Sequence, residues 1–164
     1  MHSTIACGLV VSGMLAGAAL AADQRPVEPG GKIGAMTVIR GDDSHAKNMW
    51  ASCPTHISKP GIYHRSCSPS KSPRLYIGAS DSRATQKELD SAWKNERWSL
   101  WVDRRPVDLP RFGASVSHGF NGHDFFSKSW RVILVDAPSG KHTIHYRWRQ
   151  PSGVFDVTMN VTVQ

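Results

Sequence analysis

Four residues between positions 53 and 67 have the types and the spacing of a metal site. Two residues separate Cys53 from His56, two separate His64 from Cys67, and seven lie between the pairs. Two cysteines and two histidines form a common tetrahedral zinc set, and two-residue gaps suit ligand pairs. The central interval is shorter than in the usual zinc modules. A disulfide between the two cysteines is therefore the competing interpretation.

The N-terminal segment bears on this choice. It is rich in Leu, Val, Ala and Gly, has no Lys, Arg, Asp or Glu from Met1 to Ala22, and ends in the small-x-small sequence Ala19-Leu20-Ala21. We therefore expect residues 1–21 to be a signal peptide and residues 22–164 to form the mature chain. An uncleaved membrane anchor is the alternative, because the start of the segment has little positive charge.

Export favours the disulfide. Cleavage removes Cys7 and leaves Cys53 and Cys67, which pair most simply with each other in an oxidising compartment. In the chain-entropy model, closing a loop of this length stabilises the fold by about 3 kcal/mol. Zinc bound by Cys53, His56, His64 and Cys67 stays as the alternative, and no other cofactor is expected.

Positive charge gathers around the two cysteines. The chain has 20 Lys and Arg against 13 Asp and Glu, a formal net charge of +7, which is milder than in a nucleic-acid-binding arm. Residues 44–80 are rich in Pro and Ser and contain no acidic residue. This basic cysteine loop could contact an anionic envelope polymer or lipid head groups, and the alternative is that its charges are simply solvated. Its basic residues are Lys47, Lys59, Arg65, Lys71 and Arg74.

A second cluster lies in a glycine-rich segment. His118, His123 and Asp124 could bind a metal ion or act as acid and base, so a small metal-dependent hydrolase is an alternative function. The sequence offers no nucleophile or second carboxylate to complete a mechanism. It also lacks a Gly-x-Ser-x-Gly elbow and a His-Glu-x-x-His helix. We therefore assign no catalytic residue.

Most of the chain has the pattern of β-strands. Strands are expected at 33–39, 74–78 and 130–135, and a hairpin at 98–109 that turns at Arg104-Arg105-Pro106. One short helix is expected after Thr85, because Thr85 and Glu88 have capping-box spacing.

The last two strands alternate most clearly. Apolar side chains recur at every second position along residues 141–149 and 154–163, so one face of this hairpin is buried and the other is polar. On the polar side, His145, Arg147 and Arg149 could bind a glycan or a partner, and an exposed Trp101 ring could join them. For Trp101 we expect instead that it packs under the helix against Leu89 or Trp93.

Residues 97–164 resemble bacterial immunoglobulin-like domains. The resemblance rests on Trp98-Ser-Leu-Trp-Val-Asp-Arg-Arg-Pro-Val-Asp-Leu109, Trp130-Arg-Val-Ile-Leu, Gly140-Lys-His-Thr-Ile-His-Tyr146 and the final strand. It implies an antiparallel β-sandwich with a core or corner tyrosine at Tyr146. The expected architecture is one mainly β domain, an immunoglobulin-like sandwich with one short helix and a disulfide-closed loop.

These features predict an exported, non-enzymatic binding or accessory module. We expect it in the periplasm or outside the cell. The expected partner is an anionic envelope polymer, a glycan or another exported protein, with no specific nucleic acid. Contact with a membrane is expected only through an uncleaved leader. A structural subunit that pairs through an exposed strand edge is a further alternative.

The mass of the purified protein distinguishes the disulfide from zinc. We expect it to rise by about 2 Da on reduction, because each sulfur of a disulfide gains one hydrogen, and we expect no stoichiometric zinc. Tightly bound zinc with no mass change on reduction would instead support the four-ligand site.

Overall fold

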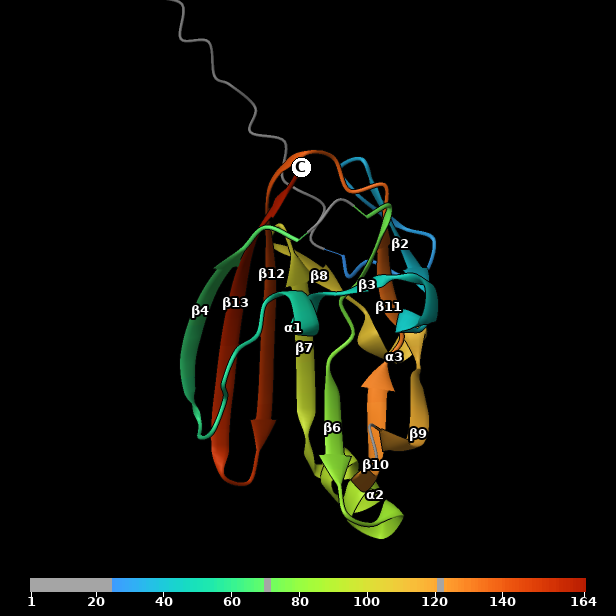
Figure 1. Cartoon of the computed structure of the whole chain (residues 1–164), viewed down its shortest axis with the longest axis vertical. Coiled ribbons are helices and arrows are strands. Elements are labelled where there is room, and N and C mark those ends of the chain that lie inside the picture. Colours follow the sequence, from blue (N-terminus) through green and yellow to red (C-terminus); the bar gives the residue numbers. More distant parts are fainter. Residues whose placement is uncertain (1–24, 70–71, 121–122) are drawn as a thin grey trace, which may run out of the picture.

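The computed structural model describes residues 25–69, 72–120 and 123–164, which fold into two layers of β-strands (Figure 1). One layer is the long sheet, with strand order β4-β13-β12-β7-β8. Its strands are β4 (Gly61–Cys67), β7 (Arg97–Val102), β8 (Arg105–Val107), β12 (Gly140–Gln150) and β13 (Gly153–Val163).

The other layer is made of two smaller sheets. The upper sheet has the order β1-β2-β11-β5-β3, and the lower sheet has the order β6-β10-β9. The upper strands are β1 (Lys32–Ile33), β2 (Met36–Arg40), β3 (Lys47–Asn48), β5 (Arg74–Tyr76) and β11 (Val132–Val135). The lower strands are β6 (Ser80–Arg83), β9 (Ala114–Phe120) and β10 (His123–Trp130). The helices are η1 (Asp43–His45), α1 (Met49–Ser52), α2 (Gln86–Asn95) and α3 (Leu109–Phe112).

The β12–β13 hairpin is the backbone of the long sheet. Its strands pair in register from Gly140 opposite Val163 to Gln150 opposite Gly153. The predicted alternation is confirmed, because one face of both strands is buried and the other is partly or fully exposed. The buried residues are Ile144, Tyr146, Phe155, Val157, Met159, Val161 and Val163.

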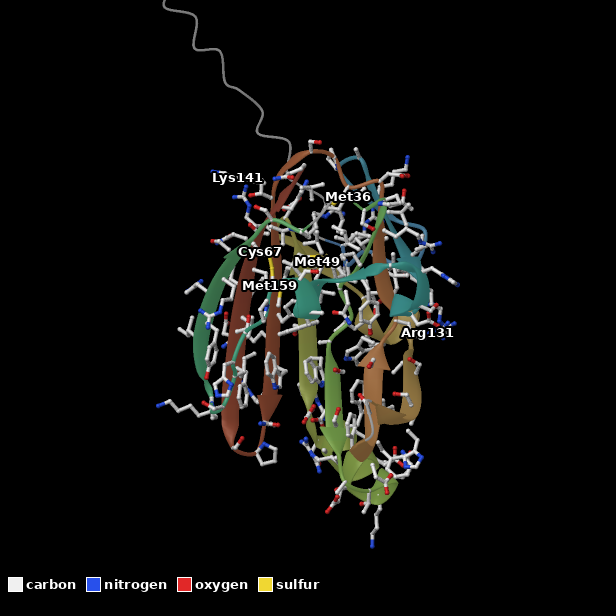
Figure 2. The ribbon with its side chains drawn as sticks, viewed as in Figure 1. Met36, Met49, Cys67, Arg131, Lys141 and Met159 are labelled. Carbon is white, nitrogen blue, oxygen red and sulfur yellow. A yellow bond between two sulfur atoms is a disulfide. The ribbon has the colours of Figure 1, made fainter. Side chains whose placement is uncertain are left out.

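Both layers contribute to one core. Met36 from β2, Met49 from α1 and Met159 from β13 are each at most 2% exposed (Figure 2). Tyr146 lies among them, and its hydroxyl donates to the Ile77 carbonyl oxygen at 2.9 Å. A buried hydroxyl needs such a partner, so this bond ties the long sheet to the opposite layer.

The upper and lower sheets join at two short interruptions, where the chain leaves a strand of one sheet and enters a strand of the other. Residue 131 separates β10 from β11, and Ile77-Gly78-Ala79 separates β5 from β6. Backbone bonds cross this junction from Ile77 to Val132 and from Trp130 to Ala79. The Tyr76 hydroxyl also donates to the Trp130 carbonyl oxygen at 2.9 Å.

Several predicted strand boundaries were wrong. The run 130–135 is broken at residue 131, between β10 and β11, and the strand expected at 74–78 ends at Tyr76. The run 33–39 is a hairpin of β1 and β2 instead of one strand, because Gly34 turns the chain with a φ of 58°. The β7–β8 turn lies at Asp103 and Arg104, both with positive φ, instead of at 104–106. The Asp103 carboxylate holds this turn, since it accepts the Thr143 N–H at 2.8 Å.

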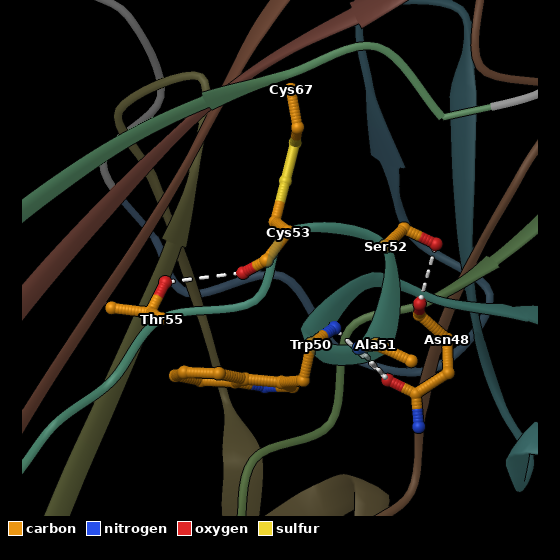
Figure 3. Close-up of a disulfide and its surroundings, with 7 residues drawn as sticks. All are labelled: Asn48, Trp50, Ala51, Ser52, Cys53, Thr55 and Cys67. Atoms are coloured by element: carbon orange, nitrogen blue, oxygen red, sulfur yellow. Dashed lines mark hydrogen bonds between the residues drawn. A yellow bond between two sulfur atoms is a disulfide. The ribbon is translucent and has the colours of Figure 1, made fainter.

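The basic cysteine loop is held by the predicted disulfide (Figure 3). The Asn48 side chain caps α1 by accepting the Trp50 N–H at 2.9 Å. The next turn buries Cys53 and places it against Cys67 at the end of β4. The chain between them supplies β4, a strand that the sequence did not predict.

Two strand pairs depart from a fully antiparallel sandwich. β4 pairs with β13 in parallel, and β3 pairs with β5 in parallel. The antiparallel expectation was therefore correct for β7, β12 and β13 and wrong at these two edges.

The predicted helix is confirmed as α2, but the expectation of a single helix was wrong, because η1, α1 and α3 also form. Thr85 Oγ1 accepts the Glu88 N–H at 3.2 Å, and the Glu88 carboxylate accepts the Thr85 N–H at 3.1 Å. Leu89 of this helix is fully buried. In the described part of the chain, no helix is both long and apolar enough to cross a membrane. The predicted leader, residues 1–21, lies outside the described residues.

Substitution of Gly78 tests the junction. A Cβ at this position would overlap the Trp130 carbonyl oxygen and the Tyr76 hydroxyl. We expect Gly78→Ala to destabilise the fold by about 1–3 kcal/mol, as overpacking does, in thermal or urea unfolding. Gly61→Ala is the matched control, because its Cβ would make only ordinary contacts with Tyr63. Equal stability of the two variants would contradict this account.

Candidate functional site

Three segments that are distant in sequence meet at one end of the molecule. They are the loop 57–60 before β4, the chain from β6 through α2, and the β12–β13 turn, all in the lower part of Figure 1. The loop touches the turn closely, because a Cβ at Gly153 would lie 2.8 Å from Pro60. Lys141, at the start of β12, lies at the other end (Figure 2).

Helix α2 is fixed against the lower sheet. The Lys128 ammonium lies 3.8 Å from an Asp90 carboxylate oxygen and 5.3 Å from the centre of the Trp93 ring. Trp93 also packs against Trp130, with ring centres 5.0 Å apart. These contacts hold the C-terminal half of α2 over β10.

Stacked aromatic rings line a hollow between the layers, which we call the tryptophan hollow. Trp98 and Trp148 stack at 5.0 Å with 12° between their planes, and Trp148 and Phe155 stack at 4.8 Å with 4°. The hollow is lined by Ile57, Ser58, Ser80, Asp81, Arg83, Trp98, Trp148, Gln150 and Phe155.

A second depression, the α2 groove, adjoins the tryptophan hollow. The two share Arg83 and Gln150. The α2 groove is lined by Arg83, Thr85, Lys87, Glu88, Ser91, Ala92, Asn95, Glu96, Gln150 and Pro151. Together they form a continuous binding end with an aromatic wall on one side and polar residues from α2 on the other.

Charged residues form the boundary between the two depressions. Arg83 pairs with the Asp81 carboxylate and lies 3.4 Å from a Glu96 carboxylate oxygen. The other Glu96 oxygen accepts the Trp98 indole N–H at 2.9 Å. Glu96 is only 5% exposed, although a glutamate side chain in water is charged at neutral pH.

Burial sets the protonation of both carboxylates. Burial and the nearby Asp81 charge raise the pKa of Glu96 to about 7, against the lowering effects of Trp98 and Arg83. Burial also raises the pKa of Asp81, against the lowering effect of Arg83. A buried carboxyl with an apolar wall beside it suits ligand binding.

The polar side of the long sheet brings together four predicted binding residues. Trp101 stacks on His145 at 4.8 Å instead of packing against Leu89 or Trp93, so the expectation that Trp101 lies under the helix was wrong. Its neighbour Trp98 contacts Trp93 instead, at 6.1 Å. Arg147 and Arg149 alternate with buried residues on the same strand and are exposed.

This polar side carries its own ion pairs. Asp156 lies 2.8 Å from His145 Nε2 and 3.9 Å from Arg147 Nε. The strand register places Ile62 of β4 beside Asp156, and Ile62 is 74% exposed. The face is therefore mostly polar, with one exposed apolar side chain beside its ion pairs.

The basic residues of the cysteine loop come from elements of both layers. Lys47 lies on β3 and Arg74 on β5, whereas Arg65 lies on β4 of the long sheet and Lys59 in the loop before it. Lys71 lies outside the described residues. The fold thus divides this predicted site between two layers.

The predicted metal sites are only partly visible. His118 Nε2 lies 2.7 Å from Asp124 Oδ1, and both side chains are exposed. Gly122 lies outside the described residues, and the side chain of His123 is not described. At the other site the disulfide uses both sulfur atoms, and His56 and His64 are exposed. In residues 25–69, 72–120 and 123–164, no three metal-binding side chains of His, Cys, Asp or Glu gather.

Sequence reasoning missed the charged residues of the binding end. Asp81 and Arg83 lie in a strand that was not predicted, and Glu96 was interpreted only as part of the helical pattern. Trp148 was correctly predicted to face inward. The alternation of apolar and polar residues in β12 did not show that the buried face of the sheet lines a hollow near the β12–β13 turn.

Comparisons with known proteins found no matching family model and no matching curated protein. Two solved structures are weakly similar. One, described as PbICP-C in complex with falcipain-2, is 18% identical, with a TM-score of 0.40 over 73% of this chain and 100% of that chain. The other, the cysteine protease inhibitor EhICP2 from Entamoeba histolytica, is 11% identical, with a TM-score of 0.32 over 73% of this chain and 94% of that chain.

The pH dependence of stability tests the buried state of Glu96. Its pKa of about 7 in the fold lies above its ordinary value of 4.5, so the folded state holds the proton more tightly. Its contribution to stability is therefore full below pH 4.5 and is lost as the pH rises through 7. We expect Glu96→Gln to remove a decline on the order of 2 kcal/mol between pH 5 and pH 8, measured by urea unfolding.

Glu28→Gln is the control for this measurement, because the Glu28 side chain is 58% exposed. It should keep the native pH profile. An identical decline in native protein and Glu96→Gln would show that Glu96 does not titrate in this range.

Proposed function

We propose that this chain is an exported, non-enzymatic binding module that holds a protein partner at its binding end. The observation that best supports this proposal is that the tryptophan hollow adjoins the α2 groove. Three segments that are distant in sequence form these two depressions. Trp and Arg side chains are enriched where proteins bind one another, and both line this end. The depressions suit an inserted loop or side chain better than a flat polymer surface.

The fold gives this end a rigid support. The β12–β13 turn joins two fully paired eleven-residue strands. The Cys53–Cys67 disulfide links the chain shortly before loop 57–60 to the end of β4. Binding residues on loops held by a rigid scaffold lose little conformational entropy on association. The arrangement therefore favours recognition by a preformed surface.

The immunoglobulin-like relationship of residues 97–164 belongs to the same proposal. It is supported by the antiparallel order of β7, β12 and β13 and by the buried hydroxyl of Tyr146, which bonds across the layers to Ile77. Export rests on the leader-like residues 1–21 and on the disulfide, which persists best in an oxidising compartment.

Capture of a partner with matched arginine substitutions tests the binding end. Ser58 and Ser91 are exposed and line the tryptophan hollow and the α2 groove, respectively. Ser139 is exposed in the turn before β12, an eleven-residue strand away and thus roughly 35 Å distant. Partners captured from the host's envelope and secreted fractions are identified by mass spectrometry and then rebound as purified proteins.

We expect Ser58→Arg and Ser91→Arg to weaken rebinding at least tenfold, because a long charged side chain fills each depression, and Ser139→Arg to leave it unchanged. A cysteine protease is one defined protein for the same test, with inhibition as the readout. Rebinding that survives both substitutions but is lost in Arg147→Glu would move the binding surface to the polar side of the long sheet.

A further inference from the structure

The tryptophan hollow has an unbalanced charge. Two carboxylates, Asp81 and Glu96, share the single guanidinium of Arg83. The side chains of Asp81 and Glu96 are 13% and 2% exposed, so water screens them little. With both carboxylates ionised, the pair has one negative charge that Arg83 does not neutralise.

One carboxylate oxygen lacks a partner. Asp81 Oδ1 bonds to Arg83, but Asp81 Oδ2 is buried and has no hydrogen-bond partner in the described residues. A buried acceptor without a donor costs free energy, and a charged one costs more. Asp81 lines the hollow and its side chain is 13% exposed, so a donor that enters the hollow can reach the exposed part of this carboxylate.

The nearest other cations do not fill this role. Lys128 of β10 lies opposite Asp81 in the strand register, but its ammonium pairs with Asp90 over the Trp93 ring. Arg97 of β7 donates to the Lys94 and Glu96 carbonyl oxygens instead of to a carboxylate. Below pH 7, protonation of Glu96 removes the excess negative charge; above it, neither Lys128 nor Arg97 supplies the balancing cation.

The wall of the hollow suits a flat cation. Trp98, Trp148 and Phe155 are stacked nearly parallel, and they line the hollow together with Asp81. A guanidinium group stacks on aromatic faces and donates in its own plane to a carboxylate, whereas an ammonium has no plane to stack. The wall and the unpartnered oxygen together select a guanidinium.

We propose that the tryptophan hollow binds an arginine side chain of the partner protein, whose guanidinium contacts the aromatic wall and donates to Asp81. This inference rests on the proposed function, since the arginine would be supplied by the protein held at the binding end. It also makes a claim about the hollow alone, which can be tested without any partner.

The test uses two small probes that differ in one atom of the side-chain head. N-acetyl-arginine amide is titrated into the purified protein and compared with N-acetyl-citrulline amide, a neutral urea of nearly the same shape. Binding is followed through the indole N–H signals of Trp98 and Trp148 in NMR spectra. We expect the arginine probe to shift both signals with saturation and the citrulline probe to leave them in place.

Variants assign the binding to the carboxylates. At pH 8, where Glu96 is ionised, Asp81→Asn and Glu96→Gln should each weaken binding of the arginine probe at least tenfold. Asp108→Asn is the matched control, because Asp108 lines a separate depression with Val27 and Arg105, and it should bind as the native protein does. Melting curves confirm that each variant is folded, and the two carboxylate variants check one another if either unfolds.

The pH profile gives an independent readout. Since Glu96 has a pKa of about 7, raising the pH from 6 to 8 supplies its charge and should tighten arginine binding by about tenfold. Asp81, Arg83, Lys128 and Arg97 are the charged side chains around it, and Asp81 changes in the same direction. Glu96→Gln should lose most of this dependence.

The inference is overturned if the citrulline probe binds equally well, if Asp81→Asn binds the arginine probe unchanged, or if no signal shifts at millimolar probe. Failure of the proposed function is distinguishable. Probe binding without any effect of Ser58→Arg and Ser91→Arg on partner capture would leave a cation site on a module that binds elsewhere. Capture that depends on this end without probe binding would refute only the arginine.

Discussion

The paired ladder of β12 and β13 is the constraint on which the rest of the structure depends. Its residues pair without a bulge from one end to the other, so side chains alternate strictly between two faces. The inner face supplies much of the core, and the outer face carries the ion pairs around Asp156. Both free edges of the ladder are then used, by β7 on one side and β4 on the other.

At the binding end the same ladder creates a conflict between burial and charge. Trp148 and Phe155 extend the apolar inner face to the β12–β13 turn. Asp81 lines the same hollow, and Glu96 is buried against Trp98. Glu96 is tolerated there because the indole of Trp98 and the guanidinium of Arg83 donate to it. A purely structural role would be served as well by apolar residues, since buried ion pairs add little net stability.

Local patterns were enough to predict the elements with strong periodicity or a capping signal. The alternation at 141–163 and the Thr85–Glu88 box each describe an element that forms largely from its own residues. Two cysteines behind a leader-like N-terminal segment were enough to predict their bridge. By contrast, β4 has four exposed residues of seven and little alternation of its own, because its position comes from the backbone of β13.

The binding end was mostly hidden from the sequence for the same reason. Alternation separates Trp98 from Trp101 but does not say which face a helix covers, and α2 covers the inner one. Asp81 and Glu96 are ordinary charged residues in the sequence. Their burial arises from strands and a helix that meet only in three dimensions.

The position of β4 also has a consequence for how the chain matures. Until β4 docks, β13 is an edge strand with unpaired backbone groups and an apolar face, which is a template for aggregation. β4 and β13 lie about 90 residues apart in sequence, and contacts over such separations form slowly. The Cys53–Cys67 bridge holds the end of β4 to α1 and so restricts the conformations of this segment before it docks. Yield of soluble protein should therefore depend on how soon oxidation follows synthesis.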